Sequence, residues 1–229
     1  EALLYMLRQG ERPTDLEIEI LDLALLLHAE HGGGNNSSFT TYVVTSSASD
    51  IYGTITAAIG SLKGPLHGAA NKKVMDMMSD IKSHVSDWSD TGQVRDYLAK
   101  IIKKEAYDNS GKIYGLGHAV YTKSDPRAII LKERAADLAA KVGREDEYNL
   151  YCLIESEGPG VFAEIKGSDK VIAPNVDFFS GFVYDCLGIP AEIYTPMFAM
   201  ARSAGWCAHR IEEILSGRRV IRPAYKFVG

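Results

Sequence analysis

A histidine flanked by small and helix-starting residues is the first feature that could do chemistry. It lies in the run Gly64-Pro65-Leu66-His67-Gly68, which is followed by apolar residues at helical spacing between positions 74 and 81. Because proline suits the first turn of a helix, the run predicts that His67 lies at a helix N-terminus. The partial positive charge at such an end disfavours imidazolium, so we expect a neutral ring that offers an N–H at pH 7. Taken alone, the run also fits a histidine that only caps a buried turn.

A second run combines glycines with two potential hydrogen-bond donors, His118 and Arg127. It reads Tyr114-Gly115-Leu116-Gly117-His118-Ala119-Val120-Tyr121 and continues through Ser124-Asp125-Pro126-Arg127. The glycines indicate that the backbone comes close to another group. The Asp-Pro pair predicts a helix with Arg127 in its first turn. The Gly-x-Gly spacing lacks the strand and helix that flank it in a dinucleotide-binding fold. A plain turn followed by a solvated arginine is the alternative that the run leaves open.

A third run, Pro174-Asn175-Val176-Asp177-Phe178-Phe179-Ser180-Gly181, places a carboxylate beside two aromatic rings. Asn175 is a typical N-cap, so Asp177 is predicted in the first turn of the helix that follows. A carboxylate there is partly desolvated by the rings and kept ionised by the helix dipole, which suits a general base. In a simpler alternative, the aspartate only interacts favourably with the helix dipole.

Composition and charge narrow the class of protein. The 229 residues are enough for one large domain or two small ones with a substantial core. A net charge of -5 gives no general attraction for nucleic acid or anionic membranes, so an anionic ligand needs local cations. The longest apolar stretch, 16–27, is interrupted by acidic residues, and neither a signal peptide nor a membrane span is predicted.

Cysteine and histidine spacings predict neither a disulfide framework nor a metal site. The three cysteines, Cys152, Cys186 and Cys207, are far apart and odd in number, which favours a reducing, intracellular location. His28 and His31 are spaced like a metal-binding pair, but no third carboxylate or cysteine ligand accompanies them at zinc spacing. We therefore expect no bound metal.

Nearly the whole chain is predicted to be helical, because the three runs lie between segments with helical periodicity. Thr14 and Glu17 form a capping-box pattern ahead of an apolar run that ends at His28, which predicts a helix buried nearly all round. Further helices are expected at 37–49, 51–62, 75–81, 94–104, 127–142, 176–187 and 196–215. Small residues crowd the first two of these, which predicts close helix packing. The run 157–160 predicts a turn, and the strand candidates are residues 161–165 and Ile221.

Four motifs follow one another along the chain: His-x-x-His-x-x-x-Asn from His28, Gly-Pro-Leu-His-Gly from Gly64, Gly-x-Gly-His-x-Val-x-x-x-x-Asp-Pro-Arg from Gly115, and Asn-Val-Asp-x-x-Ser-Gly from Asn175. In this order they resemble the citrate synthase family, and the resemblance extends over nearly the whole chain, including the ending 222–229. It implies an all-α, two-domain fold. A small helical domain, residues 70–190, would interrupt a large helical domain made of residues 1–69 and 191–229.

The resemblance also implies a reaction and three catalytic residues. In citrate synthases, the histidine at the position of His67 donates a hydrogen bond to the thioester oxygen of acetyl-CoA, and the aspartate matching Asp177 removes the methyl proton. The histidine matching His118 polarises the ketone of oxaloacetate and supplies its proton. The carbon nucleophile attacks this ketone, and water hydrolyses citryl-CoA to citrate and CoA. The chain is thus expected to be an acyltransferase of the tricarboxylic acid cycle that uses acetyl-CoA as co-substrate and no other cofactor.

Substrate contacts follow from the same resemblance. The residues expected to bind oxaloacetate or citrate are His31, Asn35, Arg127, Arg202 and, contributed across a homodimer interface, the arginine matching Arg222; His28 has a supporting role. Arg202 lies in an apolar, small-residue helix where an unpaired guanidinium is costly, which independently favours a carboxylate partner. Gly115, Gly117 and Lys123 are expected to contact CoA. Tyr121-Thr122-Lys123 stands where the family often has a basic residue soon after the histidine motif.

The opening Glu1-Ala2-Leu3-Leu4 resembles the inside of a helix, whereas citrate synthases carry a long helical portion before this point. We therefore expect a chain truncated at its N-terminus, from a cytoplasmic protein of bacterial type, with any targeting segment in the missing portion. Three alternatives stay open. They are a 2-methylcitrate synthase that uses propionyl-CoA, a non-catalytic acyl-CoA- or anion-binding homologue, and a structural helical scaffold in which Arg202 is paired to an internal carboxylate.

Overall fold

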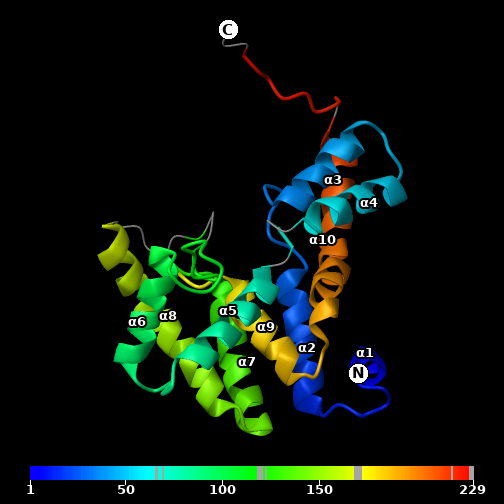
Figure 1. Cartoon of the computed structure of the whole chain (residues 1–229). Helices are drawn as coiled ribbons and strands as arrows, with labels where there is room; N and C mark the ends of the chain where they lie inside the picture. Colours follow the sequence, from blue (N-terminus) through cyan, green and yellow to red (C-terminus); the bar gives the residue numbers. More distant parts are fainter. Residues whose placement is uncertain are drawn as a thin grey trace. The chain divides into compact units, whose positions relative to one another are not determined.

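The computed structural model describes residues 1–64, 67–68, 70–117, 121, 123–167, 172–217 and 219–226. The regular structure of these residues is α-helical, apart from one 3-10 turn and one isolated bridge between Leu116 and Pro174, which confirms the expected all-α class. In chain order the elements (Figure 1) are α1 (Ala2–Leu7), α2 (Asp15–His28), α3 (Asn36–Ser46), α4 (Ile51–Leu62), α5 (Ala70–His84), α6 (Thr91–Lys103), α7 (Pro126–Val142), α8 (Glu145–Lys166), α9 (Val176–Cys186), η1 (Ala191–Ile193) and α10 (Tyr194–Ser216).

The chain divides into two compact units. Unit 1 contains Glu1–Ala24 and Ala70–Tyr194, and unit 2 contains Leu25–Ala69 and Thr195–Gly229. One boundary falls inside α2 and another at the start of α10, so each of these helices contributes residues to both units. The expected domains, 1–69, 70–190 and 191–229, refer to the family fold and stay a prediction.

Helix α9 lies at the centre of unit 1, where it packs against both α5 and α7. Nine of its 11 residues are buried, as in a helix that is apolar nearly all round. The rings of Phe178, Phe179 and Phe182 surround Tyr151 of α8, with ring centroids 5.1 to 6.1 Å from the Tyr151 centroid. Gly181 lets α5 approach, since a Cβ there would lie 2.7 Å from Cγ of Met75. The start of α9 is therefore fixed by a closely packed core.

The prediction of a turn at 157–160 and a strand at 161–165 is wrong, because both segments lie inside helix α8. Pro159 removes one backbone donor and crowds the preceding turn, which normally ends a helix. Tertiary packing outweighs this preference here. Helix α8 packs along α6, Val161 is buried, and a Cβ on Gly158 would lie 2.6 Å from Cδ1 of Leu116. The predicted strand at Ile221 is also wrong, since the described residues 219–226 have no regular structure.

Unit 2 is built on α3 and α4, which pack against each other, and on α10 beside them (Figure 1). The buried face of α3 consists of Ser37, Ser38, Thr41 and Thr45, so the predicted close packing of small side chains is confirmed. Trp206 of α10 is fully buried in a cluster with Ala58 and Leu62 of α4. These contacts fix the three helices that surround the candidate site of this unit.

Helix α2 begins with the predicted capping box. The Thr14 amide donates to Glu17 Oε2 at 2.7 Å, and the Thr14 hydroxyl donates to the same oxygen at 2.8 Å. Glu17 is buried and also accepts a hydrogen bond from Arg8 Nη2 at 2.8 Å. The helix is less buried than predicted, because Leu26 is 70% exposed. Across the described parts of the chain, no helix combines the length and the apolar character needed to cross a lipid bilayer.

Candidate active site

His67 lies in the turn between α4 and α5, and the first turn of α3 holds its ring. The Ser37 amide donates a hydrogen bond to Nε2 of His67 at 3.3 Å, and the Ser37 hydroxyl lies 3.1 Å from the same nitrogen. Amides in the first turn of a helix have no partner within that helix, so this one is available to a side chain. Because Nε2 accepts the amide hydrogen, a neutral ring carries its own hydrogen on Nδ1.

The surroundings of His67 favour this neutral ring. Burial lowers the pKa of His67 from its ordinary value of 6.5, and the positive charge of Arg202 lowers it further. The sequence predicted the same state from the N-terminus of the following helix, but α5 begins only at Ala70. The helix end that contacts the ring is that of α3, and the lowered pKa comes from burial and a nearby guanidinium.

One face of α10 holds the groups around this histidine. Trp206 Nε1 donates to the Ser37 hydroxyl at 3.2 Å, so the indole and the imidazole share one hydroxyl group. Arg202 is fully buried and donates Nε to the carbonyl oxygen of His28 at 2.6 Å, with its guanidinium 4.6 Å from the ring centroid of Phe198. Residues four apart lie on the same face of a helix. This face therefore binds both the end of α2 and the start of α3.

The segment between α2 and α3 carries two further candidates, His31 and Asn35. Asn35 is the N-cap residue of α3, and its Oδ1 accepts a hydrogen bond from the Ser37 hydroxyl at 2.9 Å. Asn35 therefore belongs to the same hydrogen-bond network as His67. His31 is half-buried and lies four residues before this cap. Unit 2 thus carries five of the predicted site residues, which are His31, Asn35, His67, Arg202 and Arg222. Ser37 joins Asn35 to His67 through short contacts.

In unit 1, the buried carboxylate of Asp125 organises two helix starts. It accepts hydrogen bonds from the Arg127 amide at 3.0 Å, from Arg127 Nε at 3.1 Å and from Nη2 at 2.8 Å. It also accepts the Val176 amide at 3.1 Å, which ties the start of α7 to the start of α9. Burial raises the pKa of Asp125, but the hydrogen bonds and charge of Arg127 and the Val176 amide hold it below its usual range. Arg127 is thereby oriented by a carboxylate that is itself fixed between two helices.

The start of α9 carries Asp177. The amide of Asp177 donates to the side-chain oxygen of its N-cap, Asn175, at 3.0 Å, as predicted. Asn175 Nδ2 in turn donates to the Gly117 carbonyl at 3.0 Å, and the Asn175 amide donates to the Gly115 carbonyl at 2.9 Å. Asp177 is half-buried and lies close enough to Tyr184 that its charge, after burial, contributes to a raised pKa of that phenol.

The two glycines of the second run have structural reasons to be glycine. Gly115 and Gly117 adopt φ values of +82° and +93°, a region that other residues rarely enter. A Cβ on Gly115 would also lie 2.6 Å from Cδ2 of Phe178. Their predicted contact with CoA stays a prediction.

Two of the predicted site residues, Lys123 and Arg222, lie apart from these networks. His118 is outside the described residues. Lys123 is exposed in a bend before α7, and Arg222 is exposed in the irregular segment 219–226. Within the described chain neither cation makes a hydrogen bond or ion pair with another candidate. Among the same residues, no three His, Cys, Asp or Glu side chains are placed to hold a metal ion.

Sequence reasoning missed three residues that organise the site. Ser37 and Trp206 fix His67, and Asp125, predicted only as a helix start, fixes both Arg127 and the start of α9. The sequence did contain one signal, because Trp206 follows Arg202 by four residues and so shares its helix face. The contacts of Ser37 with His67 and Trp206, and the contact of Asp125 with Val176, join residues far apart in the chain.

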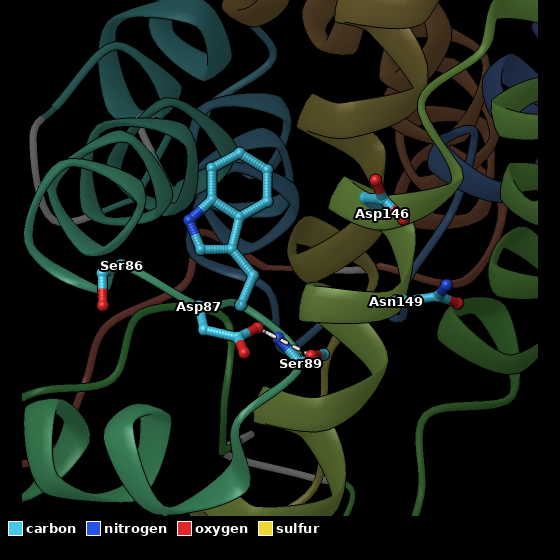
Figure 2. A pocket seen from close by; sticks show the side chains of 6 residues that line it. Ser86, Asp87, Ser89, Asp146 and Asn149 are labelled. Carbon is cyan, nitrogen blue, oxygen red and sulfur yellow. Dashed lines mark hydrogen bonds between the residues drawn. The ribbon is translucent and has the colours of Figure 1, made fainter.

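A separate pocket of about 300 Å³ lies in unit 1 (Figure 2). Figure 2 shows Asp146 and Asn149 on α8 and Ser86, Asp87 and Ser89 in the loop between α5 and α6. Asp87 Oδ1 accepts hydrogen bonds from the Ser89 amide at 2.9 Å and hydroxyl at 2.6 Å. None of the predicted site residues lines this pocket.

The chain belongs to the citrate synthase family, as its match to the family model and its identity to curated relatives show. The family model of the citrate synthase C-terminal domain matches residues 1–224. The chain is 41% identical to a citrate synthase of Haloferax volcanii, over 99% of this chain and 54% of that protein. It is 42% identical to citrate synthase 2 of Bacillus subtilis (100% and 55%) and 38% identical to a 2-methylcitrate synthase of Shewanella oneidensis (97% and 54%).

The fold of the chain is also similar to that of a citrate synthase whose structure has been solved. The ternary complex of carboxymethyl coenzyme A and oxaloacetate with citrate synthase from Thermoplasma acidophilum matches with a TM-score of 0.80 and 34% identity, over 100% of this chain and 56% of that chain. The chain thus spans about half the length of the relatives that it matches.

Proposed function

We propose that the intact protein condenses acetyl-CoA with oxaloacetate and hydrolyses the resulting citryl-CoA to citrate and CoA. The observation that carries this proposal is the state of His67, a neutral imidazole whose Nε2 is engaged by Ser37. The methyl protons of a thioester are weakly acidic, so their removal needs a hydrogen-bond donor where negative charge develops on the thioester oxygen. The Nδ1–H of His67 is suited to be this donor.

Asp177 is the proposed base. Its position in the first turn of α9 favours the ionised carboxylate, and its half-buried site next to the buried Phe178 limits hydration. The carboxylate removes a methyl proton while His67 donates to the oxygen, and the resulting carbon nucleophile attacks the ketone of oxaloacetate. The family resemblance assigns the polarisation and protonation of this ketone to His118.

Oxaloacetate is a dianion, and the proposal assigns its carboxylates to arginines. The buried Arg202 and the oriented Arg127 are the proposed partners within the chain, with His31 and Asn35 as further contacts. The residue matching Arg222 is proposed to reach the site of the other subunit in a homodimer. We also place the protein in the cytoplasm, with Gly115, Gly117 and Lys123 near CoA and with no cofactor beyond the co-substrate.

A 2-methylcitrate synthase is the second candidate, because the chain is 38% identical to one such relative and 41 to 42% identical to citrate synthases. One methylene separates propionyl-CoA from acetyl-CoA, and a pocket discriminates such a pair by roughly 1 to 3 kcal/mol. We expect kcat/KM to favour acetyl-CoA by about tenfold or more.

The test is the oxaloacetate-dependent release of CoA thiol by the intact protein, with acetyl-CoA and propionyl-CoA in parallel. Release that favours acetyl-CoA supports the proposal, and release that favours propionyl-CoA replaces it with the second candidate. A folded protein that binds oxaloacetate but releases no thiol would be a non-catalytic binding homologue.

A further inference from the structure

His209 extends the face of α10 that holds the candidate site. Arg202, Gly205 and His209 follow one another at spacings of three and four residues, so they lie along one stripe of the helix. Arg202 binds the carbonyl of His28, and the Gly205 amide donates to the Ala29 carbonyl at 3.1 Å. The next contact along this stripe is made by His209, whose side chain is only 12% exposed.

Both ring nitrogens of His209 are engaged. Nε2 forms a short contact with Oε1 of Glu30, and Nδ1 lies 2.7 Å from the Tyr42 hydroxyl. Tyr42 donates its hydroxyl hydrogen to Glu212, whose Oε2 is 3.4 Å from Nδ1 of His209. The ring of His209 therefore lies between two carboxylates and a phenol that come from three different elements.

Glu30, which contacts His209, also binds the segment that follows α2. Its Oε2 accepts the Gly32 amide at 2.6 Å, so the same carboxylate binds α10 and the backbone beside His31. Burial raises the pKa of Glu30, but the amides of Gly32 and His31 and the His209 contact hold it below its ordinary value. An ionised carboxylate only accepts hydrogen bonds, so Nε2 of His209 donates to it.

Two glycines show how closely α10 and Tyr42 approach the segment that follows α2. A Cβ on Gly205 would lie 2.4 Å from the Ala29 carbonyl oxygen and 3.0 Å from Cγ of Glu30. A Cβ on Gly33 would lie 2.7 Å from Cε2 of Tyr42. The segment is thus held on both sides of His31, before it by α10 and after it by Tyr42.

We infer that His209 is a positioning residue, which fixes Glu30 and thereby the segment 29–35 that presents His31 and Asn35 to oxaloacetate. This inference rests on the proposed function. The apparent dissociation constant of a ligand equals its intrinsic value divided by the fraction of protein in the competent conformation. Loss of the His209 contact lowers this fraction, so oxaloacetate affinity falls. Saturating oxaloacetate selects the competent conformation again, so kcat is retained.

Two variants of His209 separate its two contacts in the intact protein. The amide of His209→Gln reaches the position of Nε2 and keeps a donor for Glu30, whereas the shorter amide of His209→Asn reaches only Nδ1. We expect His209→Asn to raise KM for oxaloacetate about tenfold while kcat and KM for acetyl-CoA change less than about twofold. His209→Gln restores KM to within about threefold of wild type. His84→Asn, an exposed histidine of α5, is the matched control and leaves all three parameters unchanged.

Backbone hydrogen exchange without substrate gives a second readout. His209→Asn should speed exchange of the Gly32 and Asn35 amides, and His209→Gln should not. A wild-type protein that releases no CoA thiol overturns the proposed function. An active wild type in which the Asn and Gln variants behave alike, or in which kcat falls while KM is constant, overturns the positioning role alone.

Discussion

Ser37 contacts the Nε2 atom of His67 with two groups, a backbone amide at 3.3 Å and a hydroxyl at 3.1 Å. The amide is the decisive partner, because it can only donate and therefore assigns the ring hydrogen to Nδ1. The hydroxyl adds the link to Trp206 and to Asn35. The ring is therefore both oriented and fixed in one tautomer by the start of α3.

Removing the hydroxyl tests this arrangement. In Ser37→Ala the amide contact remains, but the buried indole N–H of Trp206 loses its acceptor, which costs about 1 to 3 kcal/mol. We expect kcat with acetyl-CoA and oxaloacetate to fall about tenfold, because His67 is less well fixed. Ser38→Ala, at the neighbouring buried serine of α3, is the control. Equal losses of kcat in both variants would show that the Ser37 hydroxyl contributes to packing and not to the orientation of His67.

Asp177→Ala should separate chemistry from binding. Without the carboxylate the methyl proton has no base, so turnover should fall by about 10²- to 10⁴-fold. Oxaloacetate binding, which the proposal assigns to the arginines, should change little by calorimetry. Asp76→Ala, on the exposed surface of α5, should leave both unchanged. Parallel loss of binding and turnover in Asp177→Ala would assign the residue a structural role.

Gly205→Ala tests the close contact between α10 and the end of α2. The added Cβ would lie 2.4 Å from the Ala29 carbonyl oxygen, and such overpacking costs about 1 to 3 kcal/mol. Gly60 of α4 is the matched control, since a Cβ at that position would have no neighbouring atom within 4 Å. Gly60→Ala should therefore stabilise the protein by about 0.5 to 1 kcal/mol in urea unfolding. If both substitutions changed the free energy of unfolding in the same direction, a close contact at Gly205 would not explain the effect.

Glu17 should make the stability of the protein depend on pH. Burial raises the pKa of Glu17, but Arg8 and Thr14 together lower it from 4.5 to about 2. Its stabilising contribution is therefore complete above pH 4.5 and is lost as the pH falls from 4.5 towards 2, by about 3 kcal/mol in total. Glu17→Gln should remove this dependence in urea unfolding followed against pH. Glu133→Gln, at an exposed site of α7, should keep it; a Glu17→Gln profile parallel to wild type would reject the assignment.

The sequence predicted most helices because their signals are local. The capping box of Thr14 and Glu17 and the N-cap Asn175 depend on residues two or three apart, and both are present. Helix α8 was missed because its continuity through Pro159 depends on packing against α6 and Leu116, which no local pattern records. The candidate site likewise combines features with local sequence signals and contacts without them. Motifs indicated His67, Arg127 and Asp177, but the Ser37 contact that holds His67 and the Asp125 contact that joins the starts of α7 and α9 are tertiary.

The contacts of Asp125 restrict which substitutions are possible at this position. One carboxylate orients Arg127 and also binds the amide at the start of the helix that carries Asp177. A substitution at this position would disturb a proposed anion-binding residue and the proposed base together. A substitution that changes substrate preference without disturbing the base is therefore expected at positions outside this shared support.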